Sequence, residues 1–408
     1  MRPVTHFKDY SQLSKYLDGL GLFHMDLTLD RMQRFWMAHG MPTLPVVHIV
    51  GTNGKGSTVA FFSSLARAHG LKVGSFTSPH FLSPRERVQV NRRMLSEKDW
   101  VELANDILSV PGGDSLTYFE FQTCLAMLAF RRAEVDVAIM EAGLGGRYDA
   151  TNVFRPGLTL FTPMGMDHEK VLGSTLAEIA RDKAGALREG GQGLTGFQEA
   201  EAMIELETRA EAVRARLIHA VDVAEPVRNL KLGLKGIHQT VNAHLALAGW
   251  RWFAATHGVK SSYQGEVFGL ESAFLPGRFQ LAEVAGRAIL LDGAHNAHAM
   301  VALKAALEAE DMKPDSMIFT CLKDKDLTAM LPLVRELTAG PILVPAMKNE
   351  RARDNRELAA EIGSRAVALD SMETALAAGS ECSGTTLVCG SLYLLAEFYT
   401  LYPRLLTP

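Results

Sequence analysis

The sequence predicts a two-domain α/β protein, with a parallel sheet and a phosphate-binding P-loop in the N-terminal domain and a smaller Rossmann-like α/β domain at the C-terminus. Three observations predict this class. A chain of 408 residues is long enough for two or three domains of about 150 residues each. Short apolar runs alternate with helical stretches. A Gly-rich turn that contains a lysine directly follows the first apolar run.

The N-terminal part shows the alternation first. Its expected strands are the apolar runs at 45–50, 71–76, 135–140 and 157–162, and its expected helices are 57–69, 120–132 and 175–188. Buried strands that alternate with helices imply a parallel sheet with helices on both faces.

The same alternation restarts near residue 288 and continues to the end of the chain. The expected strands are 288–291, 317–321, 342–344, 366–369 and 386–389, and the expected helices are 296–309, 327–337, 355–362, 372–378 and 392–399. Pro276 and Gly277 interrupt the pattern just before this second series. The predicted domains are therefore residues 1–276 and 277–408.

The amino-acid composition limits the classes of protein to which the chain can belong. Hydrophobic residues make up 47% and charged residues 22%, with 42 Lys and Arg against 46 Asp and Glu, which is typical of a globular protein and gives no support to nucleic-acid or membrane-surface binding. The four cysteines show no CxxC spacing, as expected in a reducing compartment. We see neither a signal peptide nor an apolar run of about 18 residues, so a cytoplasmic protein is the default expectation.

The sequence GTNGKGS at 51–57 predicts the P-loop. Its glycines allow backbone N–H groups to approach phosphate oxygens, and the following helix adds positive potential at its N-terminus. Lys55 supplies a positive charge, and Ser57 supplies a hydroxyl for phosphate or Mg²⁺. The spacing differs from GxxxxGK[ST] because Gly56 separates the lysine from the serine. The alternative interpretation is an ordinary Gly-rich turn between a strand and a helix.

Polar residues follow three further expected strands. Thr77 and Ser78 follow the strand at 71–76, Glu141 follows 135–140, and Asp167 and His168 follow 157–162. Ligands of open α/β sheets bind beyond the carboxyl ends of the strands. Hydroxyl, carboxylate and imidazole groups beside a P-loop suit Mg²⁺, which takes few protein ligands. Individually, Glu141 could instead be a surface carboxylate, and His168 could cap or line a loop.

Three other charged residues carry weaker signals. Lys183 lies in a predicted helix, where an ordinary solvated lysine is the common case. Arg278 lies at the expected domain boundary. Asp292 follows the first strand of the second domain, where a helix cap is the usual reason for an aspartate.

Taken together, the motifs resemble those of the Mur ligase superfamily and, within it, the folylpolyglutamate synthase and dihydrofolate synthase family. The resemblance covers nearly the whole chain in order. It rests on GTNGKGS (51–57), TSPH (77–80), ERV (86–88), TYFE (117–120), EAGLGGRYDATN (141–152), MDH (166–168), KAG (183–185), PGR (276–278), DGAHN (292–296), KDKD (323–326) and GSLYL (390–394).

The resemblance implies an ATP-binding domain followed by a glutamate ligase domain. It implies that the ATP phosphates contact the backbone around Gly54, Lys55, Gly56 and Ser57, and that Asn242, Arg278 and Asp292 also contact ATP. It further implies that Thr77, Glu141 and His168 are the protein ligands of two Mg²⁺ ions, with Ser78 as a substitute for Thr77, and it admits a K⁺ ion. Lys183 would be carbamylated, and the residues expected to act in catalysis are Lys55, Lys183 and His168.

The resemblance also implies three segments that contact the pterin-bearing substrate. These are Met25, Asp26 and Leu27, then Thr117, Tyr118, Phe119 and Glu120, and finally Tyr148, Asp149 and Ala150. Tyr148 stands where the family often has leucine.

The expected activity is an ATP-dependent carboxylate–amine ligation. L-Glutamate would be added to dihydropteroate, to (tetrahydro)folate, or to both, through an acyl phosphate, giving dihydrofolate and folylpolyglutamates. One alternative is a Mur-type ligase acting on a UDP-sugar peptide precursor, although TYFE and the segment 26–31 favour the folate branch. A second is a non-catalytic nucleotide-binding module. The expected partners are these small molecules, without nucleic acid or membrane, and the expected state is a monomer.

Overall fold

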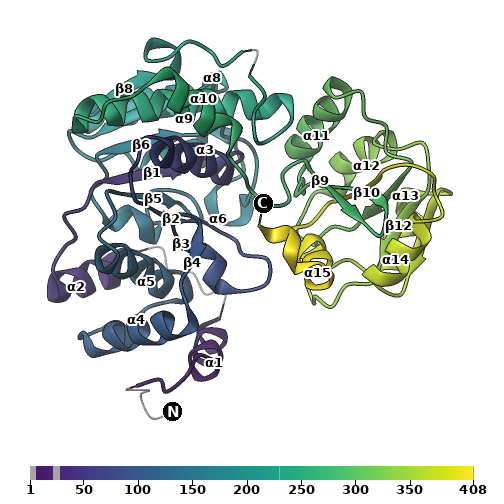
Figure 1. Ribbon diagram of the computed structural model, residues 1–408, viewed down its shortest axis with the longest axis horizontal. Coiled ribbons are helices and arrows are strands. Elements are labelled where there is room, and N and C mark those ends of the chain that lie inside the picture. Colours follow the sequence, from purple (N-terminus) through teal and green to yellow (C-terminus); the bar gives the residue numbers. More distant parts are fainter. Residues whose placement is uncertain (1–5, 22–27, 229, 408) are drawn as a thin grey trace. The chain divides into compact units, whose positions relative to one another are not determined.

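The computed structural model describes residues 6–21, 28–228 and 230–407, and the chain divides into two compact units (Figure 1). The larger unit comprises Met1–Leu230 and Val241–Ser272, and the smaller unit comprises Lys231–Thr240 and Ala273–Pro408. The division after Ser272 lies slightly before the boundary that Pro276 suggests. The assignment of Lys231–Thr240 to the smaller unit had no counterpart in the sequence pattern.

The described part of the larger unit contains an eight-stranded sheet in the order β4-β3-β2-β5-β1-β6-β7-β8. Its strands are β1 (Val46–Val50), β2 (Val73–Phe76), β3 (Val88–Val90), β4 (Arg93–Met94), β5 (Val137–Glu141), β6 (Leu158–Phe161), β7 (Gln192–Thr195) and β8 (Arg216–His219). The six strands from β2 to β8 in this order are parallel, which confirms the predicted parallel sheet. β3 and β4 pair antiparallel at one edge, which the sequence analysis did not anticipate.

Helices cover this sheet. They are α1 (Tyr10–Leu20), α2 (Asp30–His39), α3 (Lys55–Ala68), α4 (Glu97–Ser109), α5 (Tyr118–Arg132), α6 (Glu169–Leu172), α7 (Leu176–Ala184), α8 (Ala200–Ala212), α9 (Ile237–His257) and α10 (Tyr263–Glu271). In Figure 1, α4 and α5 lie toward the β4 edge, and α8 to α10 lie toward the β8 edge. Ser96, Thr117 and Thr175 begin α4, α5 and α7 through reciprocal capping boxes.

Apolar packing explains why the central strands are so hydrophobic. All five residues of β1 are buried. Ala138 and Met140 of β5 belong to a core that also contains residues of α1, α2, α4 and α5. Val50 and Phe161 belong to a second core with residues of α7 and α8. The sheet is therefore enclosed mainly by apolar side chains, with a few buried polar residues such as His48 and Thr159 inside the strands.

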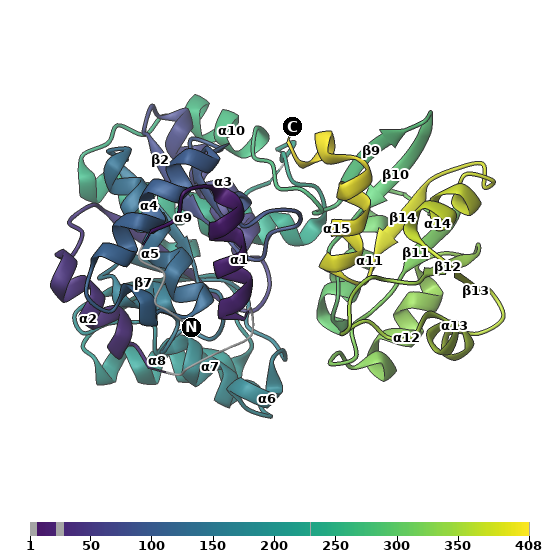
Figure 2. The same ribbon diagram turned by 90° about the horizontal axis from the view of Figure 1, so that it is seen from below.

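The smaller unit has a six-stranded sheet in its described residues, in the order β13-β12-β11-β14-β10-β9. The strands are β9 (Gln280–Val284), β10 (Arg287–Leu291), β11 (Ser316–Phe319), β12 (Ile342–Pro345), β13 (Ala366–Leu369) and β14 (Thr386–Cys389). The helices are α11 (Ala297–Ala309), α12 (Leu327–Glu336), α13 (Asn355–Ile362), α14 (Met372–Gly379) and α15 (Leu392–Leu401). Five strands are parallel, and β9 forms an antiparallel hairpin with β10 (Figure 2).

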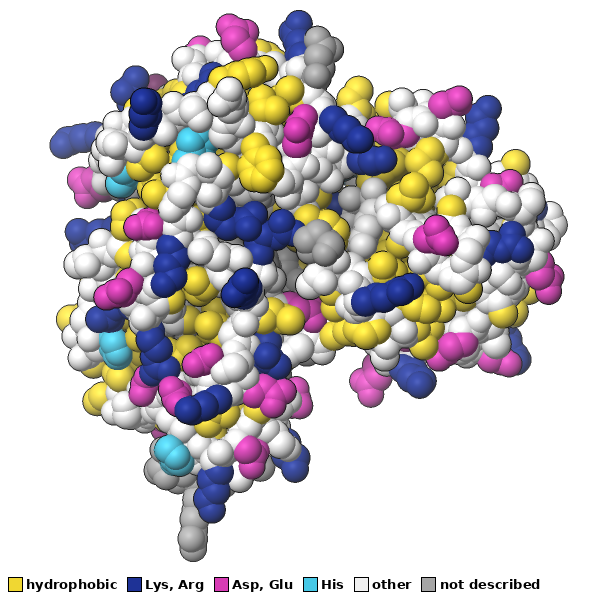
Figure 3. Space-filling view, viewed as in Figure 1, with side chains coloured by type: hydrophobic (Ala, Val, Ile, Leu, Met, Phe, Trp, Pro, Cys, Tyr) yellow, Lys and Arg dark blue, Asp and Glu magenta, His cyan; other side chains and the backbone are white. Residues whose placement is uncertain are grey.

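The surface carries both signs of charge. Lys and Arg side chains are interspersed with Asp and Glu side chains on the face that Figure 3 shows, in agreement with the near balance of the sequence. Within the described residues, none of the helices is long and apolar enough to cross a membrane.

Candidate active site

The P-loop connects β1 to α3, as the sequence predicts. Gly54 is the N-cap of α3 and has a φ of 85°, in the left-handed region that favours glycine. A Cβ atom at Gly54 would lie 2.2 Å from Oδ1 of Asn242. Asn242 of α9 is therefore packed against the start of α3. The first amides of a helix have no intrahelical acceptor, so this end of α3 can bind an anion.

The loop after β6 holds the P-loop in place. The amides of Thr52 and Asn53 donate to the carbonyl of Pro163 at 3.1 and 3.2 Å. The Thr52 hydroxyl donates to the Gly165 carbonyl, and the Gly165 amide donates to the same hydroxyl, both at 3.0 Å. These contacts were not predicted, and no distinct sequence signal indicates them. They fix the loop before any phosphate binds.

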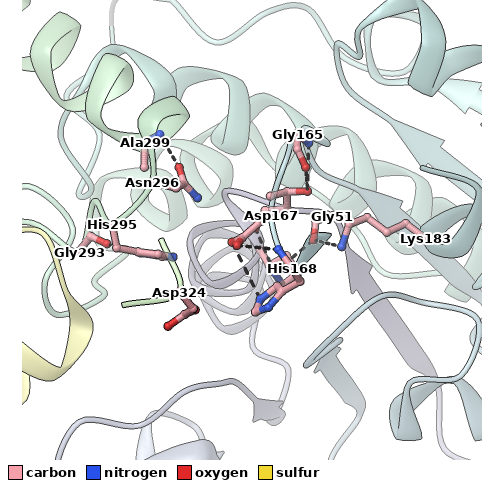
Figure 4. A network of polar contacts seen from close by, with 12 residues as sticks. Gly51, Gly165, Asp167, His168, Lys183, Gly293, His295, Asn296, Ala299 and Asp324 are labelled. Atoms are coloured by element: carbon pink, nitrogen blue, oxygen red, sulfur yellow. Dashed lines mark hydrogen bonds and ion pairs between the residues drawn. The ribbon is translucent and has the colours of Figure 1, made fainter. Parts of the chain in front are cut away.

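Two lysines share one carbonyl oxygen of the P-loop. Lys55 Nζ donates to the carbonyls of Gly51 and Thr52 at 3.2 and 3.1 Å. Lys183 Nζ, from the last turn of α7, donates to the same Gly51 carbonyl at 3.1 Å (Figure 4). Burial, together with the nearby charge of Lys55, lowers the pKa of Lys183 to about 7. Lys183 is thus a buried amine beside the loop, and the solvated lysine of the sequence analysis is excluded.

The predicted metal ligands follow neighbouring strands. β2, β5, β1 and β6 are adjacent and parallel, so their carboxyl ends meet at one edge. The register pairs Phe76, the last residue of β2, with Met140, so Thr77 and Glu141 follow at the same level of the sheet. Glu141 is buried, and its Oε2 accepts a hydrogen bond from the Ser78 amide at 3.2 Å. The surface-carboxylate alternative for Glu141 is therefore wrong.

His168 lies at the N-terminus of α6. Its φ of 55° is left-handed, and its side chain is half exposed. The Asp167 carboxylate accepts from the His168 amide at 2.9 Å, and its other oxygen lies 4.0 Å from His168 Nε2 (Figure 4). Asp167 therefore fixes the backbone at this position and lies close to the imidazole ring.

Thr77, Glu141 and His168 offer a hydroxyl, a carboxylate and an imidazole to a divalent cation. Among the described residues there is no group of three or more His, Cys, Asp or Glu side chains that could hold a metal ion. One buried carboxylate with a hydroxyl and an imidazole on neighbouring strands fits Mg²⁺, whose remaining ligands are commonly waters and substrate phosphates. A zinc site enclosed by four protein ligands does not fit.

The N-terminus of α5 carries the TYFE motif and is firmly held. Glu120 accepts two hydrogen bonds from Arg31, Nε to Oε2 at 2.9 Å and Nη2 to Oε1 at 3.1 Å. Glu120 Oε2 also accepts from the Thr117 amide at 2.8 Å. Tyr118 is buried under the guanidinium of Arg87, which lies 5.5 Å from the ring centroid. The Glu120 side chain of the TYFE motif thus forms a bidentate ion pair with Arg31.

The segment after Glu141 packs against α5. A Cβ atom at Gly143 would lie 2.5 Å from the Phe119 ring, so glycine permits this close approach. Asp149 is buried and accepts from the amides of Gly143 and Leu144 at 2.8 and 2.9 Å, and from the amide and hydroxyl of Thr151. Burial raises the pKa of Asp149, although these donors lower it. The carboxylate therefore organises the loop.

The remaining residues that are predicted to contact the substrate lie in different environments. Tyr148 is 38% exposed and Ala150 is buried. Met25, Asp26 and Leu27 lie outside the described residues. The structure thus links the segments 117–120 and 148–150 through Gly143, which packs against Phe119 and donates to Asp149, and does not describe the third.

Arg278 and Asp292 lie together in the smaller unit. Asp292 is buried and accepts from the amides of Phe279 and Ala294, both at 2.9 Å. Arg278 Nη1 would lie 2.3 Å from a Cβ atom at Gly293, so glycine allows the guanidinium to approach the backbone. Asp292 does not cap α11, because Asn296 is its N-cap and accepts from the Ala299 amide at 2.8 Å (Figure 4). The helix-cap alternative for Asp292 is therefore wrong.

Comparisons with known proteins agree with these motifs. The family model described as Mur ligase, glutamate ligase domain, matches residues 277–392. A Bacillus subtilis protein named dihydrofolate synthase/folylpolyglutamate synthase is 32% identical over 430 residues, covering 96% of this chain and 98% of that protein.

Two solved structures extend the similarity to the whole fold. Escherichia coli FolC in complex with DHPP and ADP is 29% identical, with a TM-score of 0.85 and coverage of 97% of this chain and 98% of that chain. The Yersinia pestis bifunctional folylpolyglutamate synthase/dihydrofolate synthase complexed with AMPPNP and Mn ion is 27% identical, with a TM-score of 0.86 and the same coverage.

These findings confirm the family resemblance that the motifs suggested, and they do not favour a ligase for UDP-sugar peptides. The chain therefore belongs to the dihydrofolate synthase/folylpolyglutamate synthase family of ATP-dependent ligases, which carry the Mur-ligase glutamate ligase domain.

Proposed function

We propose that the chain joins L-glutamate to dihydropteroate, to reduced folates, or to both, using ATP to activate the substrate carboxylate as an acyl phosphate. One observation carries the site assignment. Lys55 and Lys183 both donate to the Gly51 carbonyl of the P-loop, at 3.2 and 3.1 Å. The buried Glu141 ends the strand next to β1. A lysine side chain, a second, buried amine and a carboxylate at one sheet edge suit ATP with a divalent cation.

The nucleotide would bind through the N-terminus of α3. The amides of Gly54, Lys55, Gly56 and Ser57 would donate to phosphate oxygens, and Lys55 would neutralise charge that develops during phosphoryl transfer. Asn242 is packed against Gly54 and is proposed to contact the nucleotide. Arg278 and Asp292 are proposed as further nucleotide contacts.

The reaction would run in two steps. A carboxylate oxygen of the pteroyl or folyl substrate attacks the γ-phosphorus of ATP, the bond to the β–γ bridging oxygen breaks, and ADP leaves. The glutamate amine then attacks the acyl carbon, phosphate leaves, and the amine loses a proton as the amide forms. The protein's part is to position the groups and to stabilise phosphoryl charge.

The proposed ligands of two Mg²⁺ ions are Thr77, Glu141 and His168, with Ser78 as the substitute for Thr77. When bound, Mg²⁺ would neutralise charge on the phosphate oxygens. Lys183 is proposed to react with CO₂ to form a carbamate, which needs the neutral amine that its lowered pKa supplies. The carbamate would replace a cation by an oxygen donor, whereas a free ammonium would repel a nearby metal ion. The proposed cations are therefore two Mg²⁺ ions and a K⁺ ion.

The substrate would contact Thr117, Phe119 and Tyr148. Phe119 and the loop around Gly143 pack together, so an aromatic ring placed there would meet both segments. Tyr118, Glu120, Asp149 and Ala150 would shape this region from behind, because their side chains are buried. Met25, Asp26 and Leu27 are retained as proposed contacts from the sequence.

Product analysis tests this function. The chain is incubated with ATP, Mg²⁺ and L-glutamate, offering dihydropteroate, tetrahydrofolate or a UDP-sugar peptide in separate reactions, with K⁺ or Na⁺ as the monovalent ion. We expect products one or more glutamyl units heavier from the pterin substrates, and ADP only when both glutamate and a pterin substrate are present. ADP formation without any pterin product would contradict the proposal, and a heavier UDP-sugar peptide would favour the wall-precursor alternative. Nucleotide binding without turnover would favour a non-catalytic module.

A further inference from the structure

The larger unit contains a pocket that none of the P-loop residues 51–57 lines. Its volume is about 250 Å³, somewhat below the roughly 300–1,000 Å³ typical of sites for drug-sized ligands. Residues from the start of α2, the segment before Asn152, the end of α7 and α8 form its walls. The lining includes Asp30, Arg147, Tyr148, Arg188 and Arg209.

Positive charge dominates this pocket. Its walls hold three arginines and one carboxylate, Asp30. Burial lowers the pKa of both Arg188 and Arg209, and neighbouring guanidiniums lower it further, Arg209 acting on Arg188 and Arg147 acting on Arg209. None of the ion pairs found among the described residues involves these three arginines. The pocket therefore differs from the mixed surface around it.

Two of the guanidiniums are already held in position. Arg209 donates through Nε and Nη2 to the Leu187 carbonyl at 3.2 and 3.0 Å. Arg188 donates through Nη2 to the Asn152 carbonyl, and its buried Nε has no hydrogen-bond partner. A guanidinium has five N–H donors, so most donors of this pair remain available. Because the side chains are ordered in advance, an anion binds at a lower entropic cost.

The third guanidinium lies at the more accessible side. Arg147 is exposed and its guanidinium carbon lies 5.1 Å from the centroid of the Tyr148 ring. Its amide donates to the Asp182 carbonyl at 3.0 Å, and Asp182 is the residue before Lys183. The backbone of the pocket is therefore continuous with the loop and helix end that place Lys183 beside the P-loop.

We propose that this pocket binds glutamyl carboxylates of the substrate's growing tail. The inference rests on the proposed function, since a ligase that adds glutamate repeatedly creates a substrate with one more carboxylate in each cycle. Planar guanidiniums bind carboxylates through paired hydrogen bonds. Tyr148, a proposed substrate contact, lines the same pocket. Guanidiniums bind inorganic phosphate through the same kind of hydrogen bonds, so phosphate is the competing anion for this pocket.

Direct binding to the full chain tests the assignment without turnover. Calorimetry measures the affinity for a γ-linked triglutamate peptide, for an α-linked one, for glutamate and for inorganic phosphate. We expect a triglutamate to bind more tightly than glutamate or phosphate. In Arg147→Gln/Arg209→Gln the affinity for triglutamate should fall by about tenfold or more for each lost charge-assisted contact.

Two further variants keep the test sharp. Arg216→Gln removes the same charge at an exposed position of β8 and should leave binding unchanged. Arg147→Gln alone avoids the loss of the Arg209–Leu187 contact, so it stays informative if the double variant does not fold. Absence of triglutamate binding to the wild type, or equal binding by wild type and Arg147→Gln, would overturn the proposal, as would phosphate binding more tightly than triglutamate. Failure of the proposed function would instead appear as an absence of glutamylated pterin products.

Discussion

Two effects lower the pKa of Lys183, its own burial and the nearby charge of Lys55. A lysine with an ordinary pKa is almost fully protonated at neutral pH. Because the pKa of Lys183 is lowered to about 7, a large share of its amine is neutral at pH 7.5. Only the neutral amine can react with CO₂, so the buried position supports carbamate formation.

We expect carbamylation of Lys183 to rise with pH through about 7 and to level off above it, because the neutral amine accumulates there. ¹³C-bicarbonate labelling followed by NMR measures the carbamate signal. Lys183→Ala should lose both the signal and most activity, and small carboxylic acids should restore part of the activity by occupying the vacated space. A wild-type chain that shows turnover without a carbamate signal would indicate that Lys183 is a cationic contact to ATP or substrate.

Lys55 is expected to act in the transition state of phosphoryl transfer. Its ammonium donates to two loop carbonyls, those of Gly51 and Thr52, so its removal should not disturb the core. Lys55→Ala should lower kcat by about 10²–10³, the scale for losing one preorganised charge partner. Steady-state kinetics measures the effect, and Lys98→Ala, on the exposed surface of α4, is the matched control. Near-normal turnover of Lys55→Ala would remove this lysine from the mechanism.

The start of α3 depends on a glycine for two separate reasons. Gly54 has a φ of 85°, and a Cβ atom there would lie 2.2 Å from Asn242 Oδ1. Gly70 also has a φ of 85°, but nothing lies within 4 Å of its Cβ position. Substitutions at Gly54 and Gly70 therefore distinguish the effect of backbone strain, which both share, from that of steric overlap, which only Gly54 has.

Gly54→Ala and Gly70→Ala should each lose about 1–2 kcal/mol of stability through left-handed backbone strain. Gly54→Ala should lose more, because the Asn242 side chain or α3 must move. It alone should also weaken binding of an ATP analogue. Denaturant titrations and calorimetry measure both quantities, and equal stabilities with equal nucleotide affinities would contradict the close packing of Asn242 on the P-loop.

The central strand β1 contains a buried histidine. His48 Nε2 lies 2.7 Å from the Thr151 hydroxyl, and burial lowers the pKa of His48 to about 3. In the unfolded chain the pKa of histidine is about 6.5. Between these two values the unfolded state binds a proton that the folded state does not, so the free energy of unfolding falls as pH falls.

We expect His48 to contribute a slope of about 1.4 kcal/mol per pH unit between pH 6.5 and about 3. Asp149 acts in the opposite direction, because its pKa is raised in the folded state. The difference between the wild type and His48→Gln isolates the histidine. Urea titrations across this pH range should show a shallower fall for His48→Gln, with His219→Gln as the control; parallel pH profiles for wild type and His48→Gln would contradict a neutral buried His48.

Two units with separate hydrophobic cores should not behave as one two-state folding unit. The larger unit contains the P-loop, whereas the core around Leu303, Met317 and Leu387 belongs to the smaller unit. A ligand whose main contacts lie in one folded unit stabilises mainly that unit by mass action.

Thermal unfolding should therefore show two transitions. A non-hydrolysable ATP analogue with Mg²⁺, present at 100 times its Kd, should stabilise the larger unit by about 2.7 kcal/mol. Scanning calorimetry combined with hydrogen exchange assigns each transition to its unit. At the same concentration of analogue, Lys55→Ala should reduce the stabilisation by about 1.4 kcal/mol for each tenfold loss of affinity. An equal stabilisation of both units would contradict the assignment of the main nucleotide contacts to the P-loop.

Local sequence patterns determined much of the fold and the composition of the site. The parallel strands β1, β2, β5 and β6, the Rossmann-like series after β10, and the P-loop follow from apolar runs, glycines and caps that act over a few residues. Polar residues at the strand ends follow from the same pattern, because parallel strands place their carboxyl ends at one edge. The family resemblance added the expected ligands and chemistry.

Contacts between distant segments were decided by the tertiary structure. Lys183 and Gly51 are 132 positions apart, and the helical pattern around Lys183 equally allows a solvated side chain. The packing of Asn242 against Gly54, the commitment of Asp149 to its own loop and the pocket of Arg147, Arg188 and Arg209 depend on how helices settle on the sheet. The antiparallel edges β3, β4 and β9 likewise depend on neighbouring strands. Sequence periodicity reports which face of an element is apolar, whereas burial and side-chain partners are set by what packs against that face.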